Sequence, residues 1–165
     1  MTGLWAQLQS LVIAAVMAVA AWFGLEPDAR VAKGIATVTD GDTVRLNGAP
    51  IRLKGVDAPE MRQSCRRDGR PYPCGEVSKQ ALVERLEDRT LTCRITGRDR
   101  YRRALAFCAV EGEDVGAWLV EQGLAVGYGD YEREEARARS RRLGLWAGEF
   151  QRPAEWRREH GPRGA

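Results

Sequence analysis

Short runs of alternating apolar and polar residues begin after residue 30 and are separated by turn-forming residues. Residues 34–39 and 43–46 flank the Asp-Gly-Asp sequence at 40–42, and an Asp-Gly pair between two such runs is a strong signal for a β-hairpin. A second turn at residues 47–50 leads into another strand-like run at residues 51–56. The pattern therefore predicts three short strands at the start of the folded domain.

The spacing of apolar residues changes from two to about 3.6 after residue 74, which indicates a helix over residues 75–88. The residues expected on its apolar face are Val77, Ala81, Leu82 and Leu86.

Two further alternating runs, TLTCRITG and RALAFCAV, predict a second hairpin around the polar loop at residues 98–103. Beyond it, Asp114 is placed to cap a helix that ends at Gly123, and residues 131–142 form a helix dense in charge. The order is three strands, a helix, two strands and two helices. This order predicts an α+β, mainly β fold, an OB-type five-stranded Greek-key barrel with about three helices.

The N-terminal 30 residues are expected to lie outside this barrel. Residues 11–25 form an uncharged apolar stretch, which is short for a spanning helix of roughly 20 residues and suits the core of a signal peptide. Ala18-Val19-Ala20 has the pattern of a cleavage site, but no Lys or Arg precedes it. We expect residues 1–30 to be a signal peptide or, through residues 4–25, a membrane anchor, with a buried helix as the alternative.

The remaining boundaries follow from the same pattern. Residues 31–158 are expected to form the domain, and residues 159–165 a disordered tail. The single histidine, His160, lies in that tail, so histidine-based acid/base catalysis is excluded from the expected site. Any hydrolysis must then use carboxylates and arginines, with or without a hard metal ion.

The chain contains four cysteines, and an even number beside an export signal favours disulfides. Cys93 and Cys108 lie equally far from the midpoint of the predicted hairpin loop, so they face each other within disulfide reach. Cys65 and Cys74 then close the loop CRRDGRPYPC. Zinc is the alternative, but the chain has no CxxC pair. This pairing indicates an exported protein, periplasmic or secreted.

Arginine supplies most of the 26 basic residues, and the net charge is +3. A GC-rich gene would explain this composition, and so would phosphate recognition, because guanidinium groups bind phosphate oxygens in pairs. Composition alone does not separate the two explanations. Five arginines gather on the predicted second hairpin, which favours phosphate recognition there.

Five separated motifs, DGDTVRL, IRLKGVDAPE, DRYRRALAFC, LVEQGLA and GLWAGEF, occur in this order between residues 36 and 156. Together they resemble the thermonuclease family, whose best-known member is staphylococcal nuclease. The resemblance implies an OB-fold barrel with three helices. It also implies calcium-dependent cleavage of phosphodiester bonds in DNA and RNA that leaves 3′-phosphate ends.

The resemblance assigns the carboxylates of the first two motifs. Asp42, Asp57 and the backbone carbonyl of Ala58 match the calcium ligands of the family, and oxygen ligands suit this hard cation. Glu60 matches the general base that activates water. Without the resemblance, Asp42 is more simply read as a turn residue and Asp57 as the end of a strand.

The resemblance also assigns the basic residues. Arg52 and Arg103 match two arginines that hold the phosphate, and Arg100 and Tyr101 match a Lys-Tyr pair that binds a terminal phosphate. The usual Tyr-Gly-Arg sequence has become Tyr101-Arg102-Arg103. If the family glycine needs a positive φ, an arginine there costs about 1 kcal/mol.

Strand geometry sets one condition on this site. Arg52 and Asp57 have opposite parity and would face opposite sides of an ideal strand. Both can line one site only if a bulge or twist near Gly55 intervenes.

The sequence thus predicts a monomeric, exported nuclease that acts on DNA or RNA with bound Ca²⁺. The alternative is an OB-fold module that binds nucleic acid without catalysis, and a structural domain held by disulfides is a third interpretation. The preference for DNA or RNA and the endo or exo mode are left open by the sequence.

Overall fold

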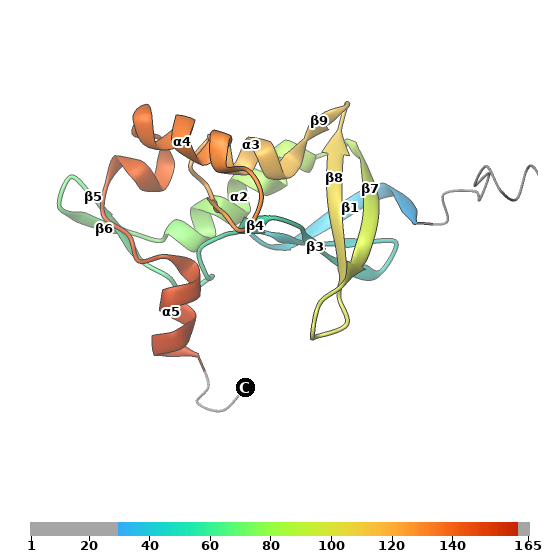
Figure 1. Cartoon of the computed structure of the whole chain (residues 1–165), viewed down its shortest axis with the longest axis horizontal. Helices are drawn as coiled ribbons and strands as arrows, with labels where there is room; N and C mark the ends of the chain where they lie inside the picture. The colour runs from blue at the N-terminus through green and yellow to red at the C-terminus, as the bar shows by residue number, and fades with distance from the viewer. Residues whose placement is uncertain (1–29, 162–165) are drawn as a thin grey trace, which may run out of the picture. The chain divides into compact units, whose positions relative to one another are not determined.

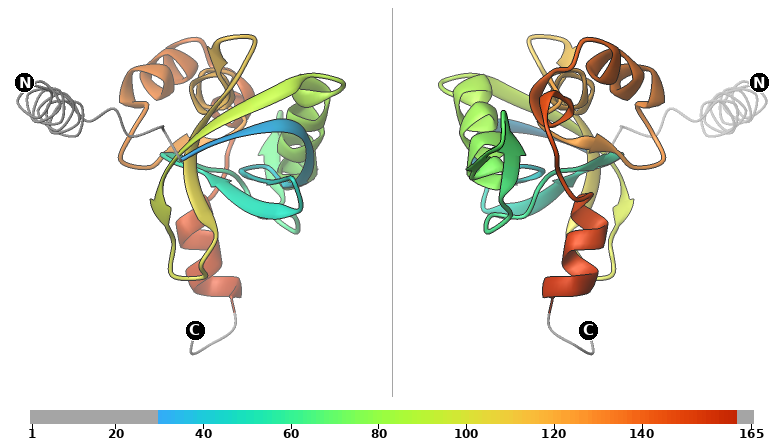
Figure 2. Two further views of the ribbon diagram at one scale, coloured as in Figure 1. Left: turned by 90° about the vertical axis from the view of Figure 1, so that its right-hand side faces the viewer. Right: turned by 90° about the vertical axis from the view of Figure 1, so that its left-hand side faces the viewer.

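Five strands close into a barrel within residues 30–161, the part of the chain that the computed structural model describes. The sheet order is β3-β2-β1-β7-β8-β9, and a parallel pairing of β3 with β8 closes the barrel (Figures 1 and 2). The five barrel strands are β1 (Val31–Asp40), β2 (Thr43–Leu46), β3 (Ala49–Leu53), β7 (Thr90–Arg98) and β8 (Ala104–Val110). The predicted OB-type barrel is confirmed.

Burial along the strands shows which side chains face the barrel interior. Along β8, buried residues alternate with half-buried ones, and in β2 only Arg45 is exposed. The β1–β2 register shifts between Val38 and Asp40, which tightens the hairpin at the predicted Asp-Gly turn. This irregularity carries Asp42 to one end of the barrel.

Within residues 30–161, five short strands lie outside the barrel, and only β9 is joined to the barrel sheet. Strand β4 (Val56–Asp57) pairs with β10 (Val126–Gly127), and β9 (Glu113–Asp114) pairs with β8. Strands β5 (Cys65–Arg67) and β6 (Arg70–Tyr72) form a small hairpin of their own, which the sequence pattern did not predict.

The helices follow the predicted order, with a 3₁₀ turn and a last helix in addition. They are α2 (Cys74–Leu86), α3 (Val115–Glu121), α4 (Glu132–Ser140), the 3₁₀ turn η1 (Gly144–Ala147) and α5 (Pro153–His160). Asp114 caps α3 as expected, since its Oδ1 accepts a hydrogen bond from the Ala117 amide at 2.8 Å. Helix α5 was not predicted as a helix.

The buried face of α2 differs from the prediction at one position. Val77 is 42% exposed, whereas Cys74, Ser78, Leu82 and Leu86, spaced by four residues, are buried. Leu82 and Leu86 lie on the buried face as predicted, whereas Ser78, four residues after the disulfide-bonded Cys74, takes the buried position expected for Val77. Helix α2 packs on β1, and α3 packs on α4.

The barrel interior and the inner faces of α2 and α3 share one hydrophobic core. Its largest fully buried side chains are Leu46, Ile51, Leu53, Leu82, Leu91 and Leu119. A second, smaller cluster joins the first disulfide to Val126 of β10 and Leu145 of η1.

Both predicted disulfides are present. Cys65 is bonded to Cys74 across the small hairpin, and Cys93 is bonded to Cys108. Cys93 and Cys108 are direct partners in the β7–β8 register, as their symmetric positions indicated. The register shifts between Ile95 and the next paired residue, so the loop itself is not symmetric.

The predicted signal peptide or anchor at residues 1–30 lies almost wholly outside the described residues. Between residues 30 and 161, every helix is too short or too polar to cross a membrane. Helix α5 continues to His160, so the first two residues of the predicted disordered tail are helical.

Candidate active site

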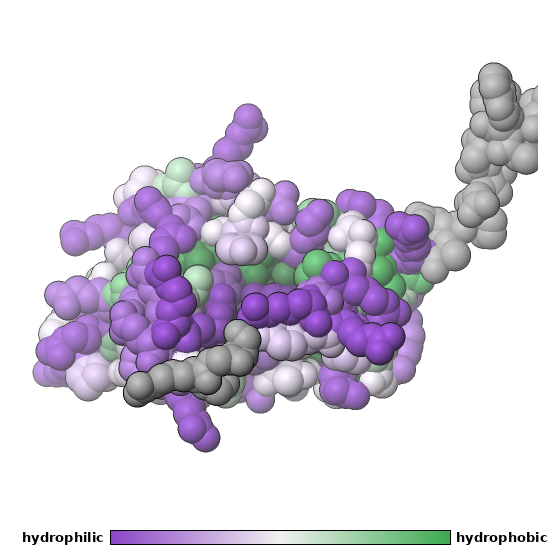
Figure 3. Space-filling model, turned by 60° about the horizontal axis from the view of Figure 1, so that its bottom comes forward, coloured by the Kyte–Doolittle hydropathy of each residue, from purple (hydrophilic) through white to green (hydrophobic). Residues whose placement is uncertain are grey.

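A cleft of about 720 Å³ opens at the end of the barrel where β1 turns into β2 and β3 leads into β4. The loop between β7 and β8 forms another wall of the cleft. Arg157 of α5 lines the cleft as well. Hydrophilic residues cover most of the face toward which α5 and this loop project (Figures 1 and 3). Tyr128 and Asp130, between β10 and α4, complete the lining, so five segments of the chain build the cleft.

Asp42 is buried at the floor of the cleft, with 4% of its surface exposed. Its Oδ1 accepts hydrogen bonds from Arg52 Nη1 at 2.7 Å and Thr43 Oγ1 at 3.1 Å, and its Oδ2 accepts one from the Ala58 amide at 3.0 Å. Burial raises the pKa of Asp42 to about 7, although the Arg52 guanidinium opposes this. The negative charge of Asp42 is therefore only partly compensated by its neighbours.

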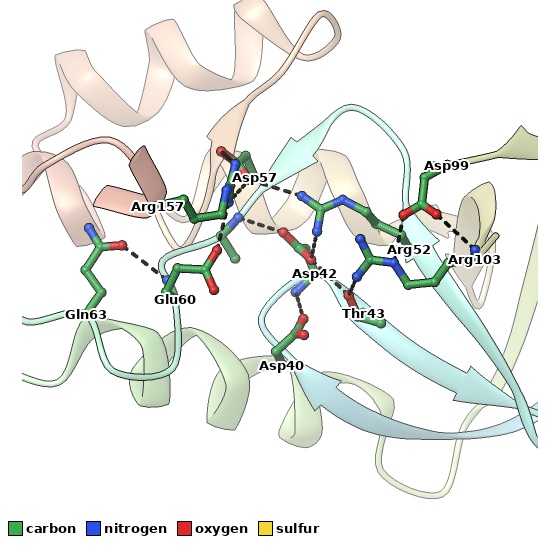
Figure 4. Close-up of polar contacts among 11 residues, drawn as sticks. Asp40, Asp42, Thr43, Arg52, Asp57, Glu60, Gln63, Asp99, Arg103 and Arg157 are labelled. Atoms are coloured by element: carbon green, nitrogen blue, oxygen red, sulfur yellow. Dashed lines mark hydrogen bonds and ion pairs between the residues drawn. The ribbon is translucent and has the colours of Figure 1, made fainter. Parts of the chain in front are cut away.

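Arg52 joins the two aspartates that the sequence analysis placed together. Its Nη2 donates to Asp57 Oδ1 at 3.0 Å while its Nη1 holds Asp42 (Figure 4). The condition set by strand parity is met at Gly55, which has a φ of +76° and lies in the two-residue turn between β3 and β4. This turn brings the Asp57 carboxylate to the same side as Arg52.

Glu60 and Asp57 are connected by Arg157, a residue that the sequence analysis missed. Arg157 Nη1 donates to Asp57 Oδ1 and to Glu60 Oε1, both at 2.8 Å, and Nη2 donates to Asp57 Oδ2 at 3.0 Å. Burial lowers the pKa of Arg157, but the hydrogen bonds that it donates to the two carboxylates outweigh burial and raise this pKa above its ordinary value. One sequence signal could have identified α5, namely Pro153 at its first position and Gly161 after its end.

Arg103 lies on the other wall of the cleft, on the loop between β7 and β8. Its Nε donates to Asp99 Oδ2 at 2.7 Å, and its Nη1 lies 3.5 Å from Thr43 Oγ1. Burial raises the pKa of Asp99, but hydrogen bonds from the Arg103 side chain and amide outweigh it and lower that pKa below its ordinary value. Arg102 has a φ of +64°, so this arginine does adopt the left-handed conformation expected of the family glycine.

Arg100 and Tyr101 line the outer rim of the cleft. Tyr101 is 58% exposed, and the guanidinium carbons of Arg100 and Arg103 lie 4.7 and 5.5 Å from the centre of its ring. This arrangement leaves the phenol at the surface beside two positive charges, where an incoming anion would meet it.

The residues present suit a hard cation in their chemistry. The carboxylates of Asp42 and Asp57 share Arg52, and the incompletely compensated charge of Asp42 is the kind of group that a cation stabilises. No group of three or more Asp, Glu, Cys or His side chains in residues 30–161 has the arrangement of a metal cluster. A cation here would therefore rely on two carboxylates, backbone oxygen and water.

A family model described as staphylococcal nuclease homologue matches residues 50–148. The chain belongs to this family. The family match begins after Asp42 and ends before Arg157, so these two members of the ion-pair network lie outside it.

Several proteins are similar to this member of the staphylococcal nuclease homologue family. The succinoglycan biosynthesis protein ExoI of Rhizobium meliloti is 40% identical over 68% of this chain, and the chain spans 63% of that protein. An uncharacterized endonuclease of Haemophilus influenzae is 27% identical over 76% of this chain and 72% of its own length. Protein ParB of Escherichia coli is 31% identical over 94% of this chain and 93% of its own length.

Proposed function

We propose that this protein is a calcium-dependent nuclease that hydrolyses phosphodiester bonds of DNA or RNA with little sequence specificity and leaves 3′-phosphate ends. The observation that carries the proposal is the convergence of Asp42, Arg52, Asp57, Glu60 and Arg103 around one cleft. Membership of a nuclease family and the relative named as an endonuclease support the same reaction class.

The proposed cation ligands are Asp42, Asp57 and the Ala58 carbonyl. Bound calcium would supply positive charge that polarises the phosphate and the attacking water. Asp42 and Asp57 would hold that charge next to Arg52, whose guanidinium lines the cleft and is the proposed contact to a phosphate oxygen. This assignment is consistent with oxygen ligands and with the buried, partly compensated charge of Asp42.

Glu60 is the proposed base. Its Oε1 is held by Arg157, and it orients a water molecule and accepts its proton as the oxygen attacks phosphorus. The bond from phosphorus to the 5′ oxygen breaks and the leaving oxygen takes up a proton from water, which leaves a 3′-phosphate on one fragment and a 5′-hydroxyl on the other. Arg52 and Arg103 are the proposed groups that stabilise charge on the phosphate oxygens, a contribution that reaches about 10³ to 10⁵ in rate in phosphoryl-transfer enzymes.

Arg100 and Tyr101 are the proposed contacts to a neighbouring phosphate. Their exposure at the rim supports a role in substrate binding outside the reacting centre. The alternative of a binding module without catalysis was motivated by Arg102, but the backbone at this position keeps the left-handed conformation and Arg103 lines the cleft. No observation therefore favours that alternative over the enzyme.

A digestion experiment tests the proposal. Purified, oxidised protein is incubated with single-stranded DNA and RNA oligonucleotides in calcium and, separately, in excess EGTA, and the fragment ends are identified by mass spectrometry. We expect cleavage with calcium alone and fragments ending in 3′-phosphate. Equal digestion in both tubes would eliminate the calcium role, 5′-phosphate fragments would eliminate the proposed bond cleavage, and no digestion at all would eliminate the enzyme.

We also propose that the protein works outside the cytoplasm as a monomer, with residues 4–25 available as a membrane anchor. Two disulfides and no free cysteine in the described residues support an oxidising compartment. Counting free thiols in denatured protein recovered from the envelope fraction tests this, and four reactive thiols per chain would contradict it. Extraction of the membrane fraction separates the two forms: salt releases a protein without an anchor, whereas an anchored protein is released only by detergent. Sedimentation gives the oligomeric state.

A further inference from the structure

Helix α5 brings a guanidinium to the two carboxylates on one side of the cleft. Arg157 makes a two-pronged contact with Asp57 and shares Nη1 with Glu60, so three of its hydrogen bonds go to the site (Figure 4). The Asp57 side chain is 3% exposed, whereas those of Arg157 and Glu60 are 40% and 36% exposed. Arg157 therefore spans from the buried floor of the site to its open side.

The contact engages only one oxygen of Glu60. Oε1 accepts from Arg157, while in residues 30–161 no donor forms a hydrogen bond with Oε2. A carboxylate with one oxygen fixed by a charged donor keeps a defined orientation, and the other oxygen remains free to accept a proton. This is the geometry that a base acting on water requires.

The start of α5 is fastened to the same loop by a second contact. Gln63 is 1% exposed, and its Oε1 accepts from the Glu60 amide at 3.2 Å while its Nε2 donates to the Gln151 carbonyl at 2.6 Å. Arg152, at the N-terminal end of α5, donates to Glu135 Oε1 of α4 at 2.7 Å. The helix that carries Arg157 is thus attached both to the Glu60 loop and to the body of the domain.

We propose that Arg157 is a positioning residue of the nuclease site, which holds Glu60 and Asp57 in the orientation that the reaction needs. The proposal rests on the proposed function. Arg157 acts through the two carboxylates, so its loss lowers the rate of the chemical step and leaves nucleic-acid binding unchanged. Loss of such orientation lowers a rate by about 10²-fold when a reacting group moves by about 1 Å.

The test compares Arg157→Gln with Arg158→Gln, which removes the same charge from the next residue of the helix. Arg158 is exposed, and no polar contact of its side chain is found in the described part of the chain. With calcium, we expect Arg157→Gln to lower kcat by about 10²-fold with KM changed less than threefold, and Arg158→Gln to retain wild-type kcat within about twofold. Adding guanidinium ion at millimolar concentration is expected to restore part of the kcat of Arg157→Ala and to leave Arg158→Ala unchanged.

Binding in EGTA separates positioning from a direct phosphate contact. Fluorescence anisotropy with a labelled oligonucleotide gives the affinity at several salt concentrations, and each phosphate contact by an arginine contributes about 0.7 to the slope for single strands. An unchanged slope in Arg157→Gln supports positioning, whereas a slope smaller by about 0.7 would overturn it, because Arg157 would then bind the phosphate itself.

The remaining outcomes are also decisive. Arg157→Lys keeps the positive charge beside Asp57 and Glu60 but cannot make the two-pronged contact. Because the charge is retained, this variant serves as a second test if Arg157→Gln does not fold. We expect its kcat to fall at least tenfold. Wild-type kcat in either variant would overturn the inference while leaving the nuclease proposal intact. A wild-type protein without cleavage would overturn both.

Discussion

The buried carboxyl of Asp42 gives the domain an unusual dependence of stability on pH. Its pKa in the folded, metal-free protein is about 7 and its ordinary value is 3.8. The folded state therefore binds the proton more tightly than the unfolded chain, so stability from this group is full below pH 4 and is lost as the pH rises through 7. The difference between the two pKa values corresponds to about 4 kcal/mol at most.

The substitution Asp42→Asn removes this titration and keeps the size of the side chain. We expect the free energy of unfolding, measured by urea titration in EDTA, to be higher in Asp42→Asn than in wild type at pH 8, by up to about 4 kcal/mol. At pH 4 the two proteins should agree within about 1 kcal/mol, because the wild-type carboxyl is then largely protonated.

Calcium provides the control in the same assay. At pH 8 it should stabilise wild type, because a ligand that binds only the folded state adds RT ln(1 + [L]/Kd), and it should not stabilise Asp42→Asn. Parallel stability curves for the two proteins between pH 4 and 8 would refute the burial argument. A variant less stable than wild type at pH 8 would refute it as well.

Three further predictions concern the scaffold. Replacing both Cys93 and Cys108 by alanine should lower the free energy of unfolding by about 3 kcal/mol, the loop-closure value for the separation of 15 residues, as measured by urea titration with and without reductant. The change Arg102→Gly should stabilise the domain by about 1 kcal/mol, because it relieves a positive φ, and leave cleavage within about twofold. Asp114→Ala should cost about 1 kcal/mol through loss of the cap on the Ala117 amide, and an unchanged urea midpoint would contradict it.

Local features of the chain were predictable from the sequence. The Asp-Gly turn, the symmetric placement of Cys93 and Cys108, and the cap at Asp114 depend on residues within one or two neighbouring elements. The alternation of side chains along a strand also indicated an irregularity near Gly55, because a regular strand would place Arg52 and Asp57 on opposite sides. Each of these features depends on residues that are close together in the sequence, so the sequence pattern alone is enough to predict it.

Long-range features were not predictable in the same way. Arg157 lies 100 residues from Asp57, and their contact depends on how α5 docks after the barrel has formed. Val77 was placed on the wrong face of its helix because periodicity alone did not weigh the disulfide at Cys74. The partner of Arg103, Asp99, was overlooked because a charged residue in a polar loop has no pattern that marks it as part of a site.

Single-turnover cleavage by wild type and Glu60→Gln tests the central claim most directly. Excess protein is mixed with an end-labelled single-stranded oligonucleotide in calcium, and the affinity of each protein for the same oligonucleotide is measured in EGTA. A nuclease that uses Glu60 as its base predicts a rate at least about 10²-fold lower in Glu60→Gln with unchanged affinity. Equal cleavage rates, or no cleavage by wild type, would contradict it.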